Sequence, residues 1–159
     1  MIVNRTALIG RPLRAATYTV SEVDVNDFLG VVAEPELMAA DAAEGPVSVE
    51  GGGVTAFSRT VPPSFAPFVA VLGLLKTFDW RDDFLFDYRT GTAMFGEQSL
   101  EFHRPLLVGE SVAISAAISD VYEKQGKQTF DVVEVTFYIK TNEAGELLMS
   151  GQQSYILFK

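Results

Sequence analysis

The residues best suited to acid–base chemistry lie in one alternating segment. His103 is the only histidine among 159 residues, and Glu101 precedes it by two positions. Side chains two positions apart on a strand share a face about 6–7 Å apart, so a Glu–His contact is possible there. Glu97 lies six residues away, roughly 20 Å along a strand, which is too far for an acid–base pair. His103 could therefore meet a substrate or partner from the sheet, but the simpler interpretation is structural packing before Arg104 and Pro105.

The composition excludes several kinds of site. The chain has no cysteine, which removes disulfides, thiolate catalysis and cysteine-ligated zinc. A single histidine also excludes a multi-histidine metal site within one chain, and no metal or cofactor is expected. The net charge of −9 repels phosphate backbones, so nucleic acid is not an expected partner. Arg5, Arg11 and Arg14 could still contact the phosphates of a CoA or carrier-protein arm, although such clustered arginines are usually solvated.

Length and hydropathy indicate one domain away from membranes. The 159 residues are 48% hydrophobic, enough for a single core that spans residues 1–159. No segment reaches the roughly 20 apolar residues that cross a bilayer. Asn4 and Arg5 interrupt the apolar N-terminal stretch, so a secretory signal is not expected either. The absence of cysteine fits a cytoplasmic location.

The first half of the chain predicts two helices separated by a loop. A short β-favouring stretch at 16–20 is followed by a capping signal at Ser21 and by helical spacing that ends at Pro35. The glycine-rich segment 44–55 is expected to form a loop. A second helix should begin near Pro62 and Pro63, because proline is tolerated in a first turn. It continues to residue 76 and is apolar on nearly every side, which predicts burial all round.

The second half of the chain predicts an antiparallel sheet. Strand patterns occupy residues 84–89, 98–104, 112–122, 133–139 and 147–158. Turn signals at 124–127 and 142–145 join the last three segments into long hairpins. The order is therefore α+β, with helices and strands segregated along the chain. A long curved antiparallel sheet wrapped around one long buried helix is a hot-dog fold.

Four segments resemble the MaoC/FAS1-like dehydratase family, in the family's order and over most of the chain. They are LIGR at 8–11 with YTV at 18–20, VPPSF at 61–65, GEQSLEFHRPL at 96–106 with VGE at 108–110, and DVYEK at 120–124. The second is similar to the family's APPTF, the third to its HGEQ…EYHRPL strand and the last to its DVYEK hairpin end. The resemblance implies an N-terminal, non-catalytic type of hot-dog domain.

The family's catalytic motif is absent from this chain. Catalytic domains of the family carry GDxNPxH after the first helix, and its aspartate and histidine activate water for addition to an enoyl-thioester. Counting from Phe28 without a gap, Glu34 takes the aspartate position and Ala39 the histidine position. Ala39 cannot transfer a proton, and Glu34 alone cannot be both a base and its oriented partner. No catalytic residue is therefore predicted, and Glu34 is read first as a solvated helix-end residue.

The resemblance also points to a set of substrate-binding residues. They are Pro63, Ser64, Phe65, Phe68, Gln98 and His103. The first three start the second helix, whose free amides could hold a thioester carbonyl. Two prolines remove two donors, so such a site would rely on Ser64, Phe65 and the following amides. A rigid helix start without any ligand is the structural alternative.

The leading hypothesis is an acyl-thioester-binding, non-catalytic subunit of a 3-hydroxyacyl-thioester dehydratase, equivalently an R-specific enoyl-CoA hydratase. The resemblance implies a second hot-dog subunit, either a separate polypeptide or a second copy, and an acyl-CoA or acyl-carrier-protein thioester. One alternative is a self-sufficient homodimeric thioesterase or hydratase that uses Glu34, Glu97 or His103 across its interface. Another is an acyl-CoA-binding module without catalysis. The sequence alone does not separate this module from the leading hypothesis.

Overall fold

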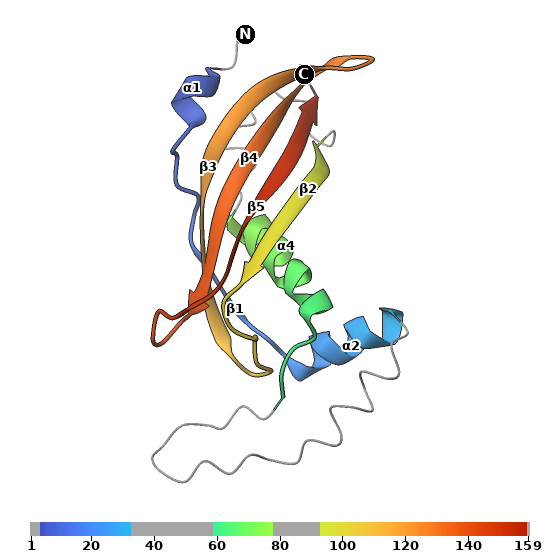
Figure 1. Cartoon of the computed structure of the whole chain (residues 1–159), viewed down its shortest axis with the longest axis vertical. Helices are drawn as coiled ribbons and strands as arrows, with labels where there is room; N and C mark the ends of the chain where they lie inside the picture. The colour runs from blue at the N-terminus through green and yellow to red at the C-terminus, as the bar shows by residue number, and fades with distance from the viewer. Residues whose placement is uncertain (1–3, 33–58, 78–92, 159) are drawn as a thin grey trace.

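The structure, a computed structural model, describes residues 4–32, 59–77 and 93–158 (Figure 1). In chain order its elements are α1 (Arg5–Leu8), β1 (Ala16–Thr19), α2 (Glu22–Val32), the 3-10 turn η1 (Pro63–Phe65), α4 (Ala66–Thr77), β2 (Ala93–Phe102), β3 (Ser111–Gln125), β4 (Thr129–Thr141) and β5 (Leu147–Phe158). The predicted loop at 44–55, the predicted strand at 84–89, Glu34 and Ala39 lie outside the described residues. The segregated α+β order agrees with the prediction.

One curved antiparallel sheet contains all five strands, in the order β1-β3-β4-β5-β2. Side chains alternate between the two faces of a strand. Val112, Ile114 and Ile118 of β3 are therefore fully buried, while Ser115 between them is exposed. The same alternation continues in β4, where Val135, Phe137 and Ile139 are fully buried. This apolar face is called the inner face, and the opposite face is called the outer face.

Helix α4 lies against the inner face, behind the sheet in the view of Figure 1. The approach is close, because a Cβ atom placed on Gly73 would collide with the side chain of Ile114. Phe65, Val69 and Ala70 are fully buried between helix and sheet. The predicted hot-dog architecture, a sheet wrapped around one helix, is confirmed.

The start of this helix differs from the prediction in two respects. The first turn is a 3-10 turn, with Phe65 N–H donating to Pro62 O at 2.9 Å and Ala66 N–H donating to Pro63 O. The α-helix then begins at Ala66, after the prolines that lack an N–H. The prediction of burial all round is wrong at Phe68, which is 40% exposed. Its ring packs instead on Phe65, with centroids 5.2 Å apart, at the margin of the core.

The two edges of the sheet are built differently. Beside β3, the short strand β1 is continued by residues 10–13, where Gly10 N–H donates to Ile118 O and Leu13 N–H donates to Ala116 O, both at 2.8 Å. Beside β5, strand β2 has no second neighbouring strand within the described ranges. The unpaired side of β2, residues Ala93–Phe102, is called the free edge.

Arg5 connects helix α1 to strands β3 and β4. Arg5 donates from Nε and Nη2 to the two carboxylate oxygens of Asp131, at 3.1 and 2.9 Å, and from Nη2 to Glu123 at 2.6 Å. The side chain of Asp131 is fully buried. Its hydrogen bond raises the pKa of Arg5. Arg5 is therefore engaged by two protein carboxylates, which balance its charge.

Candidate functional site

An apolar cavity of about 370 Å³ lies where the chain enters the hot-dog helix. Its walls are Val61, Pro63, Ala66, Phe102, His103, Arg104, Pro105 and Leu106. Val61 N–H donates to Leu106 O at 2.7 Å, which fastens the segment before η1 to the connection between β2 and β3. Phe102 is 50% exposed, so the cavity opens beside the free edge. The cavity brings together two of the predicted binding residues, Pro63 and His103.

Arg104 stands at the polar end of this cavity and is fully engaged in holding the turn. Its guanidinium binds both carboxylate oxygens of Glu110 and donates to Glu146 at 3.1 Å and to Pro105 O at 2.8 Å. Glu110 is 6% exposed and also accepts from Leu107 N–H. The bond to Glu110 raises the pKa of Arg104. The charge of Arg104 is therefore balanced by the carboxylates of Glu110 and Glu146, and the role of Arg104 is to hold this part of the structure together.

His103 borders the cavity, but its hydrogen bond lies on the outer face. Nε2 is 3.1 Å from Ser150 Oγ, and Ser150 stands opposite Glu101 in the sheet. The Glu101–His103 contact considered from the sequence is not made. Within the described residues, no carboxylate is hydrogen-bonded to His103. A histidine acting as a general base needs an orienting partner that stabilises its charged form, and a serine hydroxyl supplies no such charge.

The turn that starts α4 leaves few amides for a ligand. Pro62 and Pro63 have no N–H, and the amides of Phe65 and Ala66 already donate within the 3-10 turn. Ser64, which is exposed, is the remaining residue of this turn whose amide could meet a carbonyl. The oxyanion role proposed from the sequence therefore narrows to Ser64.

Phe65 and Phe68 belong to an aromatic cluster rather than to the cavity wall. Phe28 of α2 contacts Phe65 edge-to-face, with centroids 5.3 Å apart, and lies 6.3 Å from Phe68. Phe65 is fully buried. These rings fix α2 to the start of α4, so their position explains how the helix entry is held. Their contact with substrate stays a prediction.

Gln98 lies further along β2 on the inner face, directly opposite Gln153 of β5. Gln153 was not among the predicted residues. The sequence contains one signal that could have found it. Met149, Gln153, Tyr155 and Leu157 share the buried parity of the last strand, and Gln153 is the one amide among these apolar and aromatic residues. A polar residue at an inward position of a strand calls for a partner or a ligand.

Other classes of site find no support in the described part of the chain. Those residues contain no group of three or more histidine, aspartate or glutamate side chains placed to hold a metal ion. Among the described helices, none has the length and apolarity that would let it cross a membrane. The described site thus consists of an apolar cavity, Arg104 with its charge balanced by carboxylates, and His103 hydrogen-bonded to a serine.

Comparison with known proteins decides the family. Residues 7–150 match the profile of the FAS1-like dehydratase domain region. The chain belongs to the FAS1-like dehydratase family. This confirms the family expected from the sequence segments. A search of curated protein sequences finds no match.

Solved structures agree with the fold of this FAS1-like dehydratase domain. The HadBC (3R-hydroxyacyl-ACP dehydratase) complex of Mycobacterium tuberculosis has a TM-score of 0.63 and 20% identity over 94% of this chain and 96% of that one. A MaoC-like dehydratase from Rhodospirillum rubrum has a TM-score of 0.63 and 12% identity, over 100% and 98%. The R-hydratase PhaJ1 of Pseudomonas aeruginosa has a TM-score of 0.59 and 16% identity, over 95% and 82%. At these identities the likeness shows the hot-dog fold.

Proposed function

We propose that this FAS1-like dehydratase domain is the non-catalytic, acyl-thioester-binding subunit of a 3-hydroxyacyl-thioester dehydratase, equivalently an R-specific enoyl-CoA hydratase. The environment of His103 carries the proposal. It is the chain's only histidine, and its Nε2 is bonded to Ser150 on the outer face. Adding or removing water at a thioester needs a base and an oriented partner. A second hot-dog subunit must therefore supply the aspartate and histidine.

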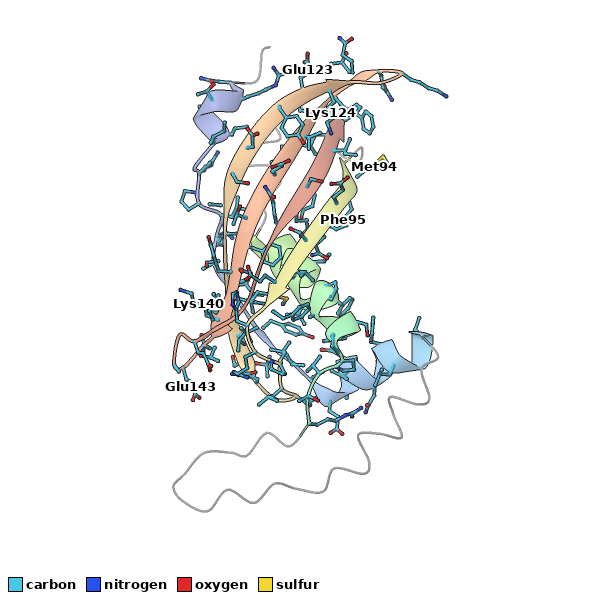
Figure 2. All side chains as sticks on the ribbon, viewed as in Figure 1. Met94, Phe95, Glu123, Lys124, Lys140 and Glu143 are labelled. Carbon is cyan, nitrogen blue, oxygen red and sulfur yellow. The ribbon has the colours of Figure 1, made fainter. Side chains whose placement is uncertain are left out.

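The free edge of β2 is the surface we assign to this catalytic partner. Met94, Phe95 and Phe102 are 54%, 48% and 50% exposed, and Figure 2 shows the first two projecting from this strand. An unpaired strand with exposed apolar side chains offers backbone donors and acceptors to a second sheet. The HadBC neighbour, which is itself a complex, supports a hot-dog partner. We infer a separate polypeptide that carries GDxNPxH, since a second copy would also hold Ala39 in place of the histidine.

The cavity at the start of α4 is the part we assign to the acyl-thioester. Val61, Phe102 and Leu106 give it apolar walls of the kind that hold acyl chains, and Pro63 and His103 stand at its border. The carrier is CoA or an acyl-carrier protein. The chain is proposed to work as one domain over residues 1–159, without a cofactor of its own. Its lack of cysteine fits the cytoplasm.

A hydration assay tests the proposal. The purified chain is mixed with crotonyl-CoA and with a longer enoyl-CoA, and loss of the enoyl-thioester absorbance is followed. We expect no turnover by the chain alone. Adding a hot-dog subunit with an intact GDxNPxH should give turnover above that of this second subunit alone, most clearly with the longer substrate. The control is the same partner with its motif histidine replaced, which should restore nothing.

Two results would overturn the proposal. Robust turnover by the pure chain, lost in Glu34→Ala, Glu97→Ala or His103→Asn, would establish a self-sufficient enzyme. Stoichiometric binding of acyl-CoA, with no gain in activity from any GDxNPxH partner, would establish a binding module instead.

A further inference from the structure

Two glutamines face each other on the inner side of the sheet. Gln98 of β2 is directly opposite Gln153 of β5, and Gln153 is opposite Val135 of β4. Val135 in turn is opposite Ile118 of β3, and both are fully buried core residues. Directly opposed residues of antiparallel strands point to the same face. The two amides therefore belong to the apolar, inner face of the sheet.

Within the described residues, the whole amide of Gln153 and the Nε2 of Gln98 are buried without hydrogen-bond partners. Gln153 is 1% exposed, and within the part of the chain that the structure describes neither its Nε2 nor its Oε1 has a partner. The Nε2 of Gln98 is buried and unpartnered in the same way. A buried amide that lacks its hydrogen bonds lowers stability, so native proteins rarely keep one without a role. Two such amides side by side require an explanation beyond packing.

A neighbouring glutamine shows what a structural amide looks like in this sheet. Gln152, on the outer face, donates from Nε2 to Glu134 at 2.7 Å, and the hydroxyl of Tyr122 donates to the same carboxylate at 3.0 Å. The outer face thus provides partners for its glutamine. Among the described residues, the inner face provides no partner for Gln153, whose neighbours by register are Gln98 and Val135.

We propose that Gln98 and Gln153 form a polar subsite that binds an oxygen function, hydroxyl or carbonyl, carried by the acyl chain. Each primary amide offers N–H donors and a carbonyl acceptor, so the pair can both donate to and accept from one ligand oxygen. This inference rests on the proposed function and narrows its substrate class. It selects acyl-thioesters whose chain carries an oxygen, in preference to plain alkyl chains.

The position of the pair determines where that oxygen lies on the chain. Phe102 lines the cavity assigned to the thioester, and Leu100 and Gln98 follow on the same face of β2. Gln98 lies four positions before Phe102 on the strand, a distance of about 13 Å. Leu100 between them is half-buried and packs against the core. An acyl chain that follows β2 from the cavity therefore meets the glutamines with its distal part, well beyond the carbons that react.

The subsite should discriminate strongly because its surroundings are apolar. A plain alkyl chain placed there would leave both amides unpaired, whereas an oxygenated chain would satisfy them. Val135 and Ile118 exclude water from one side of the pair.

Calorimetric binding of matched CoA esters tests the inference. The probes are decanoyl-CoA, ω-hydroxydecanoyl-CoA and ω-oxodecanoyl-CoA, titrated into the full chain and into the chain with a GDxNPxH partner. We expect at least one oxygenated probe to bind about tenfold more tightly than decanoyl-CoA. Gln153→Leu should abolish this preference without weakening decanoyl-CoA, and Gln98→Leu should reduce it. Gln152→Leu, the same change on the outer face, should leave it intact.

The outcomes separate this inference from the proposed function. Equal affinity of the intact chain for all three esters would overturn the subsite while acyl-thioester binding stands. A preference that survives both Gln98→Leu and Gln153→Leu would overturn it as well. If no ester binds, with or without a partner, the proposed function fails and the subsite fails with it. Melting curves of each variant confirm that the protein under titration is folded.

Discussion

The buried amide of Gln153 is expected to lower the stability of the domain when no ligand is bound. Its amide is 1% exposed, and no acceptor or donor within the described residues satisfies it. Leucine has a similar shape and needs no hydrogen bond. We therefore expect Gln153→Leu to raise the free energy of unfolding by about 1–2 kcal/mol, as measured by urea denaturation without ligand. Gln152→Leu is the control, because it loses the bond to Glu134 and should bring no gain.

A loss of stability in Gln153→Leu would mean that the amide has a partner in the folded chain. The ligand subsite would then lose its main structural support.

Two buried tyrosines are expected to make the stability of the fold fall at alkaline pH. Burial raises the pKa of Tyr155 above the ordinary tyrosine value of about 10. Burial and a 2.7 Å hydrogen bond to Asp24 raise the pKa of Tyr18 as well. In the unfolded chain these phenols ionise near pH 10, whereas the folded protein keeps them neutral. The stability that they contribute is therefore complete below about pH 10 and is lost as the pH rises further.

Melting temperatures between about pH 8 and pH 11 test this dependence. We expect a steady fall above about pH 10 that becomes shallower in Tyr155→Phe. The exposed Tyr138 provides the control, since Tyr138→Phe should leave the slope unchanged. Equal slopes in both variants would contradict the assignment to Tyr155.

At the scale of elements, Arg5 fastens helix α1 to the hairpin of β3 and β4. Removing it leaves the fully buried carboxylate of Asp131 without its two hydrogen bonds. Since the Arg5 side chain is 30% exposed, we expect Arg5→Met to cost about 2–4 kcal/mol, toward the low side of values for buried ion pairs. Urea denaturation gives the cost, and faster amide exchange at Gly10 and Leu13 would show that the segment after α1 has loosened.

Two further variants isolate the cause. Arg5→Met combined with Asp131→Asn should recover part of the loss, because a neutral amide then replaces the buried carboxylate that had bound Arg5. Arg14→Met removes an exposed arginine nearby and should change little. Equal effects of Arg5→Met and Arg14→Met would show that the ion pairs of Arg5 do not hold α1 in place.

The free edge of β2 carries its own prediction. A lysine on an edge strand opposes pairing with another sheet. Phe95→Lys should therefore weaken binding of the catalytic partner at least about tenfold, as measured by calorimetry. Tyr138→Lys replaces a similarly exposed aromatic residue on central strand β4 and should not weaken it. Unchanged affinity in Phe95→Lys would move the interface elsewhere.

Elements with strong alternation were predictable from sequence, and those set by distant contacts were not. The pattern at 112–122 became β3, because every second residue from Val112 to Ile118 meets the core; a register shift before Asp120 then moves the next buried position to Val121. Strand β2 begins at Ala93 rather than Gln98, since a register shift between Phe95 and Gln98 breaks the alternation there. The four-residue α1 is too short for a helical period. The Ser150 partner of His103 lies 47 positions away, and no local pattern could reveal it.

The candidate site residues also divide into those that a local sequence pattern predicts and those that depend on distant contacts. The family segments found Pro63 and His103, which the fold brings to one cavity. They also named Gln98, but not Gln153, because the importance of Gln153 comes from strand pairing and burial. The exposure of Phe68 was missed, since an apolar period alone cannot show which side of a helix the sheet leaves uncovered.

At the scale of the whole molecule, partner binding should appear as added stability. A partner that binds only the folded chain raises its free energy of unfolding by about 2.7 kcal/mol at a free concentration 100 times the dissociation constant. We therefore expect the melting temperature to rise with the concentration of a GDxNPxH partner, as followed by differential scanning calorimetry. The Phe95→Lys variant should show a smaller rise. A melting temperature that stays constant over the whole titration would contradict pairing.

The unequal edges of the sheet also limit how this protein can associate. On one side the four-residue β1 and the segment at 10–13 cover β3, while on the other side no strand among the described residues pairs with the ten residues of β2. Within the described residues, the sheet therefore has one long edge to which a further strand can be added. Once its open edge is occupied, the pair presents no second long edge from this chain on which a further sheet could grow. We therefore expect that the chain, added to a growing stack of sheets, would end the stack instead of extending it.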